Sequence, residues 1–125
     1  MLTFQRDEAE ATAREWIAAW NARDIEAVLR KFADDVTFHS PKAADIVGTG
    51  TVRGKAALRA YWTKGLERIG NLRFELDHVG VDAERQELFI VYLATLGERR
   101  TRACERLRFG PDGVVDAEGL YGAPV

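Results

Sequence analysis

The hydrophobic residues of this chain change their predominant spacing at Gly70, although one short alternating segment already occurs at residues 36–40. Before Gly70 they recur every three or four residues, which is the spacing of amphipathic helices. After Gly70 they alternate with polar residues, which is the spacing of half-buried strands. A chain with helices first and strands afterwards is typical of an α+β domain in which the helices cover one face of a sheet. We therefore predict one α+β domain spanning residues 1–125.

Three helices are predicted in the first part of the chain. The first runs from Asp7 to about Asn21, the second follows the cap residue Asp24 and ends near residue 33, and the third starts at Gly54. Their expected buried faces carry Ala9, Ala13, Trp16, Ile17 and Trp20 in the first helix, Ile25, Val28, Leu29 and Phe32 in the second, and Leu58, Tyr61, Trp62, Leu66 and Ile69 in the third.

The remaining segments are expected to be strands and one long loop. A short strand at residues 36–40 is stopped by Pro41, and residues 41–53 show no apolar period. A loop of this length in a compact domain tends to be functional or mobile, so it is a candidate lid. Four longer strands follow, and the short turns between them indicate antiparallel pairing. They cover about 72–81, 87–97, 100–109 and 114–121.

Composition and charge argue against several kinds of partner. The 125 residues carry a net charge of −2, which favours neither nucleic acid nor an anionic membrane as a partner. No stretch approaches the roughly 18 apolar residues of a membrane span. Cys104 is the single cysteine, and the N-terminal segment lacks the apolar core of a signal peptide, so we expect a cytoplasmic protein. No P-loop, GxGxxG or GxSxG motif is present, and no cofactor is expected.

Glu105 departs most clearly from the apolar pattern. Alternation places it on the same side of its strand as Ala103, Leu107 and Phe109. An ionised carboxylate in an apolar site is costly, so this side chain either has a partner or keeps its proton. Both states suit a pocket, because the acid donates to a carbonyl and the carboxylate accepts a proton. The alternative is a structural glutamate that pairs with a Tyr, Trp or Arg side chain, or reaches solvent at a frayed position.

Aromatic side chains are expected to form the walls around Glu105. Each of them could equally be core filling, but the Trp and Tyr polar atoms need hydrogen-bond partners when buried, and a pocket would supply them. The residues on predicted inner faces are Trp16, Trp20, Phe32, Phe38, Trp62, Phe74, Tyr92 and Tyr121.

The two histidines do not form a metal site with any nearby carboxylate at ligand spacing, so no metal is expected. Alternation turns His39 away from Phe38, toward solvent at a strand end. His78 continues the face of Phe74, but the phase changes near Gly80 and a bulge is possible there, so both faces stay open for His78. Cys104 faces away from Glu105.

Arginines crowd the third long strand. Arg102, Arg106 and Arg108 share the side opposite Glu105, and Arg99 and Arg100 precede them. One interpretation is a solvated face that pairs with acids of the neighbouring strands, namely Glu75, Asp77 and Asp116. The other is a subunit interface or a surface for an acidic partner.

Several segments of the sequence resemble the nuclear transport factor 2-like superfamily, and within it the ketosteroid isomerase and SnoaL-like polyketide cyclase branch. The resemblance covers nearly the whole chain and is carried by residues 16–24, 32–41, 52–58, 106–113 and 119–122. It implies a cone in which three N-terminal helices close over a strongly curved, mostly antiparallel sheet, with a pocket between them. It also implies a homodimer through the sheet face.

The resemblance also assigns positions to residues of the isomerase site. The general-base aspartate of that site falls on Ser40, the tyrosine oxyanion donor falls on Trp16, and the second oxyanion acid falls on Glu105. This places Ser40 in the pocket. Serine cannot accept a proton as an aspartate does, so steroid isomerisation is not expected. For a cyclase, Glu105 is the candidate acid.

Three classes of function are compatible with these observations. The first is a small-molecule lyase, isomerase or cyclase in which Glu105 acts as acid or base on an apolar carbonyl compound. The second is a protein that binds a small apolar ligand without chemistry. The third is a dimeric interaction module with a packed or water-filled interior. Loss of turnover in Glu105→Gln would favour the first class, and ligand-induced stabilisation with only modest changes in that variant would favour the second.

Overall fold

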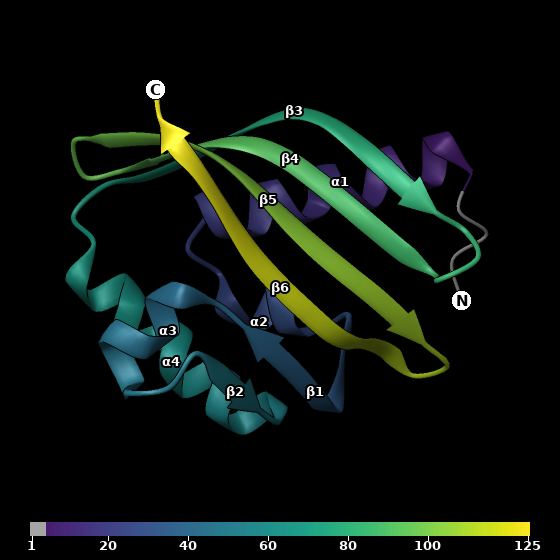
Figure 1. Ribbon diagram of the computed structural model, residues 1–125, viewed down its shortest axis with the longest axis horizontal. Helices are drawn as coiled ribbons and strands as arrows, with labels where there is room; N and C mark the ends of the chain where they lie inside the picture. Colours follow the sequence, from purple (N-terminus) through teal and green to yellow (C-terminus); the bar gives the residue numbers. More distant parts are fainter. Residues whose placement is uncertain (1–4) are drawn as a thin grey trace.

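The computed structural model describes residues 5–125, and its helices and strands follow the chain in one continuous series (Figure 1). They are α1 (Arg6–Asn21), α2 (Ile25–Leu29), β1 (Phe32–His39), α3 (Pro41–Val47), β2 (Thr51–Arg53), α4 (Lys55–Arg68), β3 (Leu72–Asp82), β4 (Glu87–Leu96), β5 (Arg99–Gly110) and β6 (Gly113–Pro124). The six strands form one sheet in the order β2-β1-β6-β5-β4-β3.

The α+β architecture predicted from the change of period is confirmed. Strands β3 to β6 pair with their neighbours in antiparallel orientation, as their short turns indicate. Strand β1 pairs with β6 in parallel orientation, and β2 pairs with β1 in antiparallel orientation. The sheet is therefore mostly antiparallel, with one parallel contact made by the segment between the helices.

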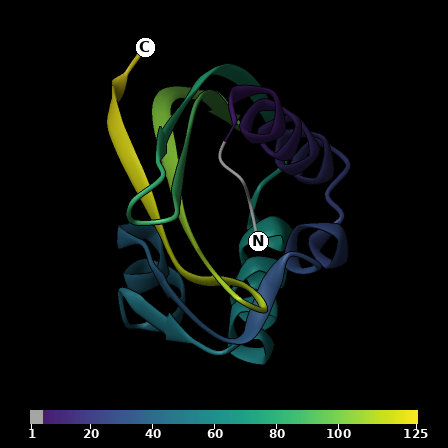
Figure 2. The same cartoon turned by 90° about the vertical axis from the view of Figure 1, so that its right-hand side faces the viewer.

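The core lies between the curved sheet and the helices on its inner side (Figure 2). The predicted stripe of α1 is buried from Ala9 to Trp20, and α4 buries Leu58, Tyr61 and Trp62. These side chains pack against alternate residues of the strands, such as Ile90. No helix within residues 5–125 combines the length and apolar character needed to cross a membrane.

The second helix is shorter than its sequence pattern suggests. Asp24 caps it as predicted, accepting a hydrogen bond from the backbone N–H of Ala27 at 3.1 Å. The helix ends at Leu29, however, and Phe32 begins β1 instead of extending the helix. Phe32 is paired with Val114 of β6, so a tertiary strand contact overrides the local period.

Residues 41–53 are not one long loop, and this prediction is wrong. They contain α3 and β2, so the chain has four helices in its described part instead of three. The Ser40 side chain accepts from the backbone N–H of Lys42 at 3.2 Å, Pro41 occupies the first turn, and Gly48 ends the helix with φ 83°. Proline at the first helical position starts a helix as readily as it stops a strand. A lid role for this segment stays a prediction.

The junction after α1 ties the helices to the sheet. The side-chain amide of Asn21 makes two hydrogen bonds with the backbone of Phe74. Its Nδ2 donates to the Phe74 carbonyl at 3.0 Å, and its Oδ1 accepts from the Phe74 N–H at 2.7 Å. Arg23 donates to the carbonyls of Leu66 and Ile69 at the end of α4, each at 2.8 Å. These hydrogen bonds connect the C-terminal end of α1 to β3 and to the end of α4.

Candidate functional site

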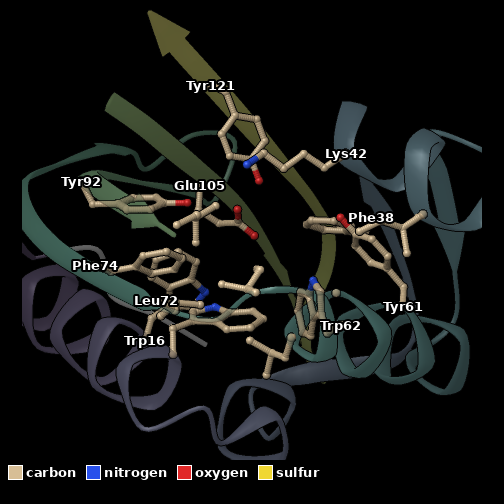
Figure 3. A pocket seen from close by; sticks show the side chains of 16 residues that line it. Trp16, Phe38, Lys42, Tyr61, Trp62, Leu72, Phe74, Tyr92, Glu105 and Tyr121 are labelled. Atoms are coloured by element: carbon tan, nitrogen blue, oxygen red, sulfur yellow. The ribbon is translucent and has the colours of Figure 1, made fainter. Parts of the chain in front are cut away.

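A cavity of about 100 Å³ lies between α1, α3, α4 and the inner face of the sheet (Figure 3). Its wall is mostly aromatic and aliphatic, with a few polar groups. The lining residues are Trp16, Trp20, Phe38, Lys42, Ile46, Tyr61, Trp62, Gly65, Leu66, Ile69, Leu72, Phe74, Tyr92, Leu96, Glu105 and Tyr121.

The aromatic part of the wall is held by contacts between rings. The Trp16 ring stacks on Phe74 with centroids 5.7 Å apart and meets the edge of Tyr92 at 5.1 Å. Trp62 meets Trp20 at 5.0 Å in an edge-on arrangement. Such offset and edge-on pairs are favourable beyond the area that they bury, so these rings form a defined surface.

Glu105 is the one acid among the described lining residues, and it is only 4% exposed. It sits in the middle of β5, between Ile90 of β4 and Gly119 of β6. Burial raises the pKa of Glu105 well above its ordinary value of 4.5; the charge of Arg106 opposes this rise and that of Glu118 adds to it. In the described part of the chain no side chain is hydrogen-bonded to its carboxyl group. Burial therefore favours the protonated form of the Glu105 carboxyl over the ionised form.

Gly119 leaves room for this acid. A Cβ atom at Gly119 would lie 3.3 Å from the Tyr121 hydroxyl and 3.5 Å from Oε1 of Glu105. The glycine on β6 therefore lies close to both polar groups without covering them, and the two oxygens lie in the same part of the site.

Two buried hydrogen-bond donors lie in the wall of the same cavity. Trp16 and Trp20 are each 7% exposed, and among the described residues neither indole nitrogen has a hydrogen-bond partner. A buried indole N–H normally has an acceptor, so these two N–H groups are available to donate hydrogen bonds to a ligand.

Three tyrosines surround the acid. Burial raises the pKa of Tyr61, Tyr92 and Tyr121, and in each case the charge of Glu105 raises it further. All three are therefore neutral phenols at physiological pH. The Ser40 side chain opposes the rise for Tyr61 and Tyr121, so it lies close to both.

The structure brings together most, but not all, of the residues predicted from the sequence. Glu105, Trp16, Trp20, Phe38, Trp62, Phe74, Tyr92 and Tyr121 all line the cavity. Ser40 is not among the lining residues: it is buried, and its side chain caps α3. Ser40 departs from its predicted position because β1 ends at His39. Ser40 is therefore the N-cap of α3 and not part of the inner face of the strand.

The histidines lie outside the cavity. A register shift between Leu76 and His78 turns His78 outward, and its exposed ring lies with Nδ1 3.6 Å from the Asp77 carboxylate. The possible pocket role of His78 is thus not supported. His39 is half-buried on the opposite face of the sheet, with Nε2 3.1 Å from Asp116. Within residues 5–125, no cluster of three or more metal-ligating side chains is found.

Lys42, Tyr61 and Ile46 are lining residues that the sequence interpretation did not place in the site. Tyr61 was assigned to the buried face of its helix, but only as core. Lys42 and Ile46 were missed because their segment was interpreted as a loop. The signal that could have found them is the Ser40-Pro41 pair, which is typical of a helix start.

The charged face predicted on β5 is paired across the sheet. Arg106 lies 2.8 Å from Glu87 and 2.6 Å from Asp116, Arg100 lies 3.4 Å from Glu75, and Arg102 pairs with Asp77. These contacts match the paired face expected from the sequence. They separate a charged outer side of the sheet from the apolar inner side that holds Glu105.

Residues 13–116 match the family model of the SnoaL-like domain. The chain belongs to the SnoaL-like domain family. Within the wider nuclear transport factor 2-like superfamily, it is similar to a SnoaL-like protein of unknown function from Burkholderia thailandensis, with 36% identity, 92% of this chain and 94% of that chain covered, and a TM-score of 0.82.

Other solved structures share the fold at lower identity. A protein of unknown function with a cystatin-like fold from Methylobium petroleophilum has 22% identity, a TM-score of 0.75, and coverage of 99% of this chain and 82% of that one. The epoxide hydrolase/cyclase-like enzyme SalBIII, described in pyran ring formation in the polyether salinomycin, has 17% identity, a TM-score of 0.71, and coverage of 93% and 92%. Both likenesses support the cone-shaped α+β fold.

Proposed function

We propose that this SnoaL-like protein binds a small, largely apolar carbonyl compound in its cavity, and that Glu105 acts on the carbonyl oxygen as an acid. The observation that carries the proposal is the buried Glu105 carboxyl, which lines an aromatic cavity without a hydrogen-bonding side chain. A protonated carboxyl in such a site donates a hydrogen bond to a carbonyl oxygen.

The size of the cavity indicates the size of the guest. An engineered protein cavity of about 150 Å³ holds benzene, whereas pockets for drug-sized ligands occupy roughly 300–1,000 Å³. The volume of about 100 Å³ found here is smaller than either, so the enclosed part suits a short branched chain or one end of a ring. A larger substrate would have to extend through the mouth.

The chemistry that this arrangement favours is acid-assisted rearrangement. A donor at the carbonyl oxygen stabilises the negative charge that develops there during enolisation, and an apolar site strengthens that interaction. The likeness to a cyclase-like enzyme is compatible with isomerase or cyclase chemistry. Steroid isomerisation is not proposed, because Ser40 stands where the base would be and its side chain caps α3.

The test uses cyclohexanone, a neutral ketone whose carbonyl end can enter the cavity while the rest of the ring lies toward the mouth. Binding is measured by calorimetry and by the NMR signals of the indole N–H groups. Chemistry is measured as exchange of the α-hydrogens of the ketone in D₂O. A solvent water removes the α-proton while the Glu105 carboxyl donates its proton to the carbonyl oxygen; the enol then returns that proton to the Glu105 carboxylate and takes up a deuteron from solvent at the α-carbon. We expect the wild type to bind the ketone and accelerate exchange, and Glu105→Gln to bind but lose the acceleration.

Glu75→Gln is the matched control, because Glu75 is a half-buried glutamate of β3 outside the cavity lining. It should exchange the ketone at the wild-type rate. Binding without accelerated exchange in the wild type would instead support a binding protein without chemistry. Absence of both binding and exchange would overturn the proposal.

A further inference from the structure

Lys42 reaches the cavity from the first turn of α3. Its Nζ atom lies 4.4 Å from the centroid of the Tyr121 ring, and its side chain is one of those that line the site (Figure 3). The lysine is half-buried, and burial followed by the positive charge of Arg99 lowers its pKa. Contact with the Tyr121 ring face compensates part of this cost, since cations are attracted to aromatic faces.

The other half-buried cations of the described chain all have acidic partners. Lys55 pairs with Asp34 at 3.7 Å, and Arg59 pairs with Glu26 at 2.7 Å. Arg106 contacts Glu87, Asp116 and Glu118. For Lys42, the described residues supply no carboxylate within ion-pair distance. Half-buried charges are normally compensated, so this ammonium group needs an anion from elsewhere.

The polar groups of the cavity point to the same conclusion. The indole N–H groups of Trp16 and Trp20 are buried without partners, and the tyrosines are neutral phenols. Glu105 is the one lining acid in the described chain; it forms no ion pair with Lys42, and burial disfavours its charged form. The site therefore offers a cation and several donors, but no permanent negative charge.

We propose that Lys42 selects a ligand with a carboxylate group: the carboxylate binds Lys42 at the mouth, and the apolar body with its carbonyl oxygen lies in the cavity beside Trp16 and Glu105. This inference rests on the proposed function and narrows the ligand to a small apolar oxo acid. The carboxylate occupies the mouth, and only the carbonyl end of the apolar body has to enter the enclosed space of about 100 Å³.

The test compares three ligands that share one ring. Cyclohexanecarboxylate carries the anion, cyclohexanecarboxamide is its neutral counterpart of similar shape, and cyclohexanone reports on the cavity itself. Affinity is measured by calorimetry and by the indole N–H signals for the wild type, Lys42→Met, Lys42→Arg and Lys64→Met. Lys64 is an exposed lysine of α4 outside the lining, so Lys64→Met removes the same charge without touching the site.

We expect the wild type to bind the carboxylate at least tenfold more tightly than the carboxamide. Lys42→Met should weaken carboxylate binding by about tenfold to a hundredfold, the usual effect of losing a hydrogen bond to a charged group. Lys42→Arg should retain most of the affinity, and Lys64→Met should equal the wild type. Added salt should weaken binding of the carboxylate more than that of the ketone.

The outcomes separate this inference from the proposed function. If cyclohexanone binds in all variants while the carboxylate has no advantage over the carboxamide, or keeps it in Lys42→Met, the role of Lys42 is overturned and the cavity function stands. If no ligand shifts the indole signals, both proposals fail. Unchanged ketone binding by Lys42→Met also shows that this variant is folded.

Discussion

At the scale of single residues, Glu105 links the stability of the protein to pH. Burial raises the pKa of Glu105 in the folded state above the value of 4.5 that it has when solvated. Between these two values the folded state holds a proton that the unfolded state has released. Stability therefore falls as pH rises from about 4.5 through the folded pKa, by about 1.4 kcal/mol for each unit by which the pKa is raised.

Glu105→Gln should remove this dependence, because the amide is neutral at every pH. We expect the variant to gain stability relative to the wild type between about pH 5 and the folded pKa, and the gain to level off above that pKa. Urea unfolding at a series of pH values measures the difference. Glu75→Gln, at a half-buried glutamate of β3 outside the cavity lining, serves as the control and should lack this rise. A difference for Glu105→Gln that stays constant from pH 5 to 9 would contradict a proton held in the folded state.

The sequence identifies residues whose role follows from a local period. Alternation along β5 places Glu105 between the buried Ala103 and Leu107, and the helical period places Trp16 and Trp20 on one buried face. It does not identify Lys42, whose position depends on how α3 packs against the rest of the fold. It also leaves the side of His78 open, because a bulge changes the phase of a strand without a sequence rule that fixes where it falls.

At the scale of elements, α3 is the part that the sequence pattern misses. Seven residues make about two turns, which is too short to show a hydrophobic period. The helix is instead defined by its ends, with the Ser40 cap and Pro41 at the start and Gly48 in the left-handed conformation at the end. Since α3 carries Lys42 and Ile46, these end residues also position one side of the cavity.

Gly48→Ala tests this dependence on the helix end. A Cβ atom at Gly48 would meet no atom within 4 Å, so the substitution adds backbone strain at φ 83° without a steric clash. We expect a loss of about 1 kcal/mol in the free energy of unfolding, measured by chemical denaturation, and weaker binding of cyclohexanecarboxylate.

Gly70→Ala is the matched control, because its Cβ would also meet no atom within 4 Å and its φ lies outside the left-handed range. It should be neutral or slightly stabilising. Equal effects of the two substitutions would show that the left-handed end of α3 is not required.

At the scale of the whole molecule, the two faces of the sheet have different tasks. The inner face meets the helices and the cavity, and its alternating apolar residues predict that arrangement. The parallel pairing of β1 with β6 joins segments that lie far apart in the chain, and no local sequence pattern predicts it. On the outer face, hydrogen bonds from Arg106 and His39 outweigh the effect of burial and lower the pKa of Asp116. This network keeps charges paired across β4, β5 and β6 near the middle of the sheet.

The outer face also carries an apolar patch, and we propose that it mediates a homodimer through the sheet. Leu120 of β6 is 43% exposed beside its strand neighbour Cys104, and both line a depression with Val91. A leucine and a shallow apolar depression on the same surface form a self-complementary patch, as a two-fold interface requires. The paired arginines around it supply a polar rim.

Leu120→Glu should abolish such a dimer, because a carboxylate in the centre of an apolar interface loses its hydration without gaining a partner. Light scattering after size exclusion should give twice the chain mass of 14.0 kDa for the wild type and the single mass for Leu120→Glu. Val81→Glu is the control, because Val81 is also an exposed apolar residue, 38% accessible, but lies near the far end of β3. A monomeric wild type, or a Leu120→Glu variant that still dimerises, would rule out this interface. Either result would leave ligand binding in the cavity unaffected, because binding depends on the opposite face of the sheet.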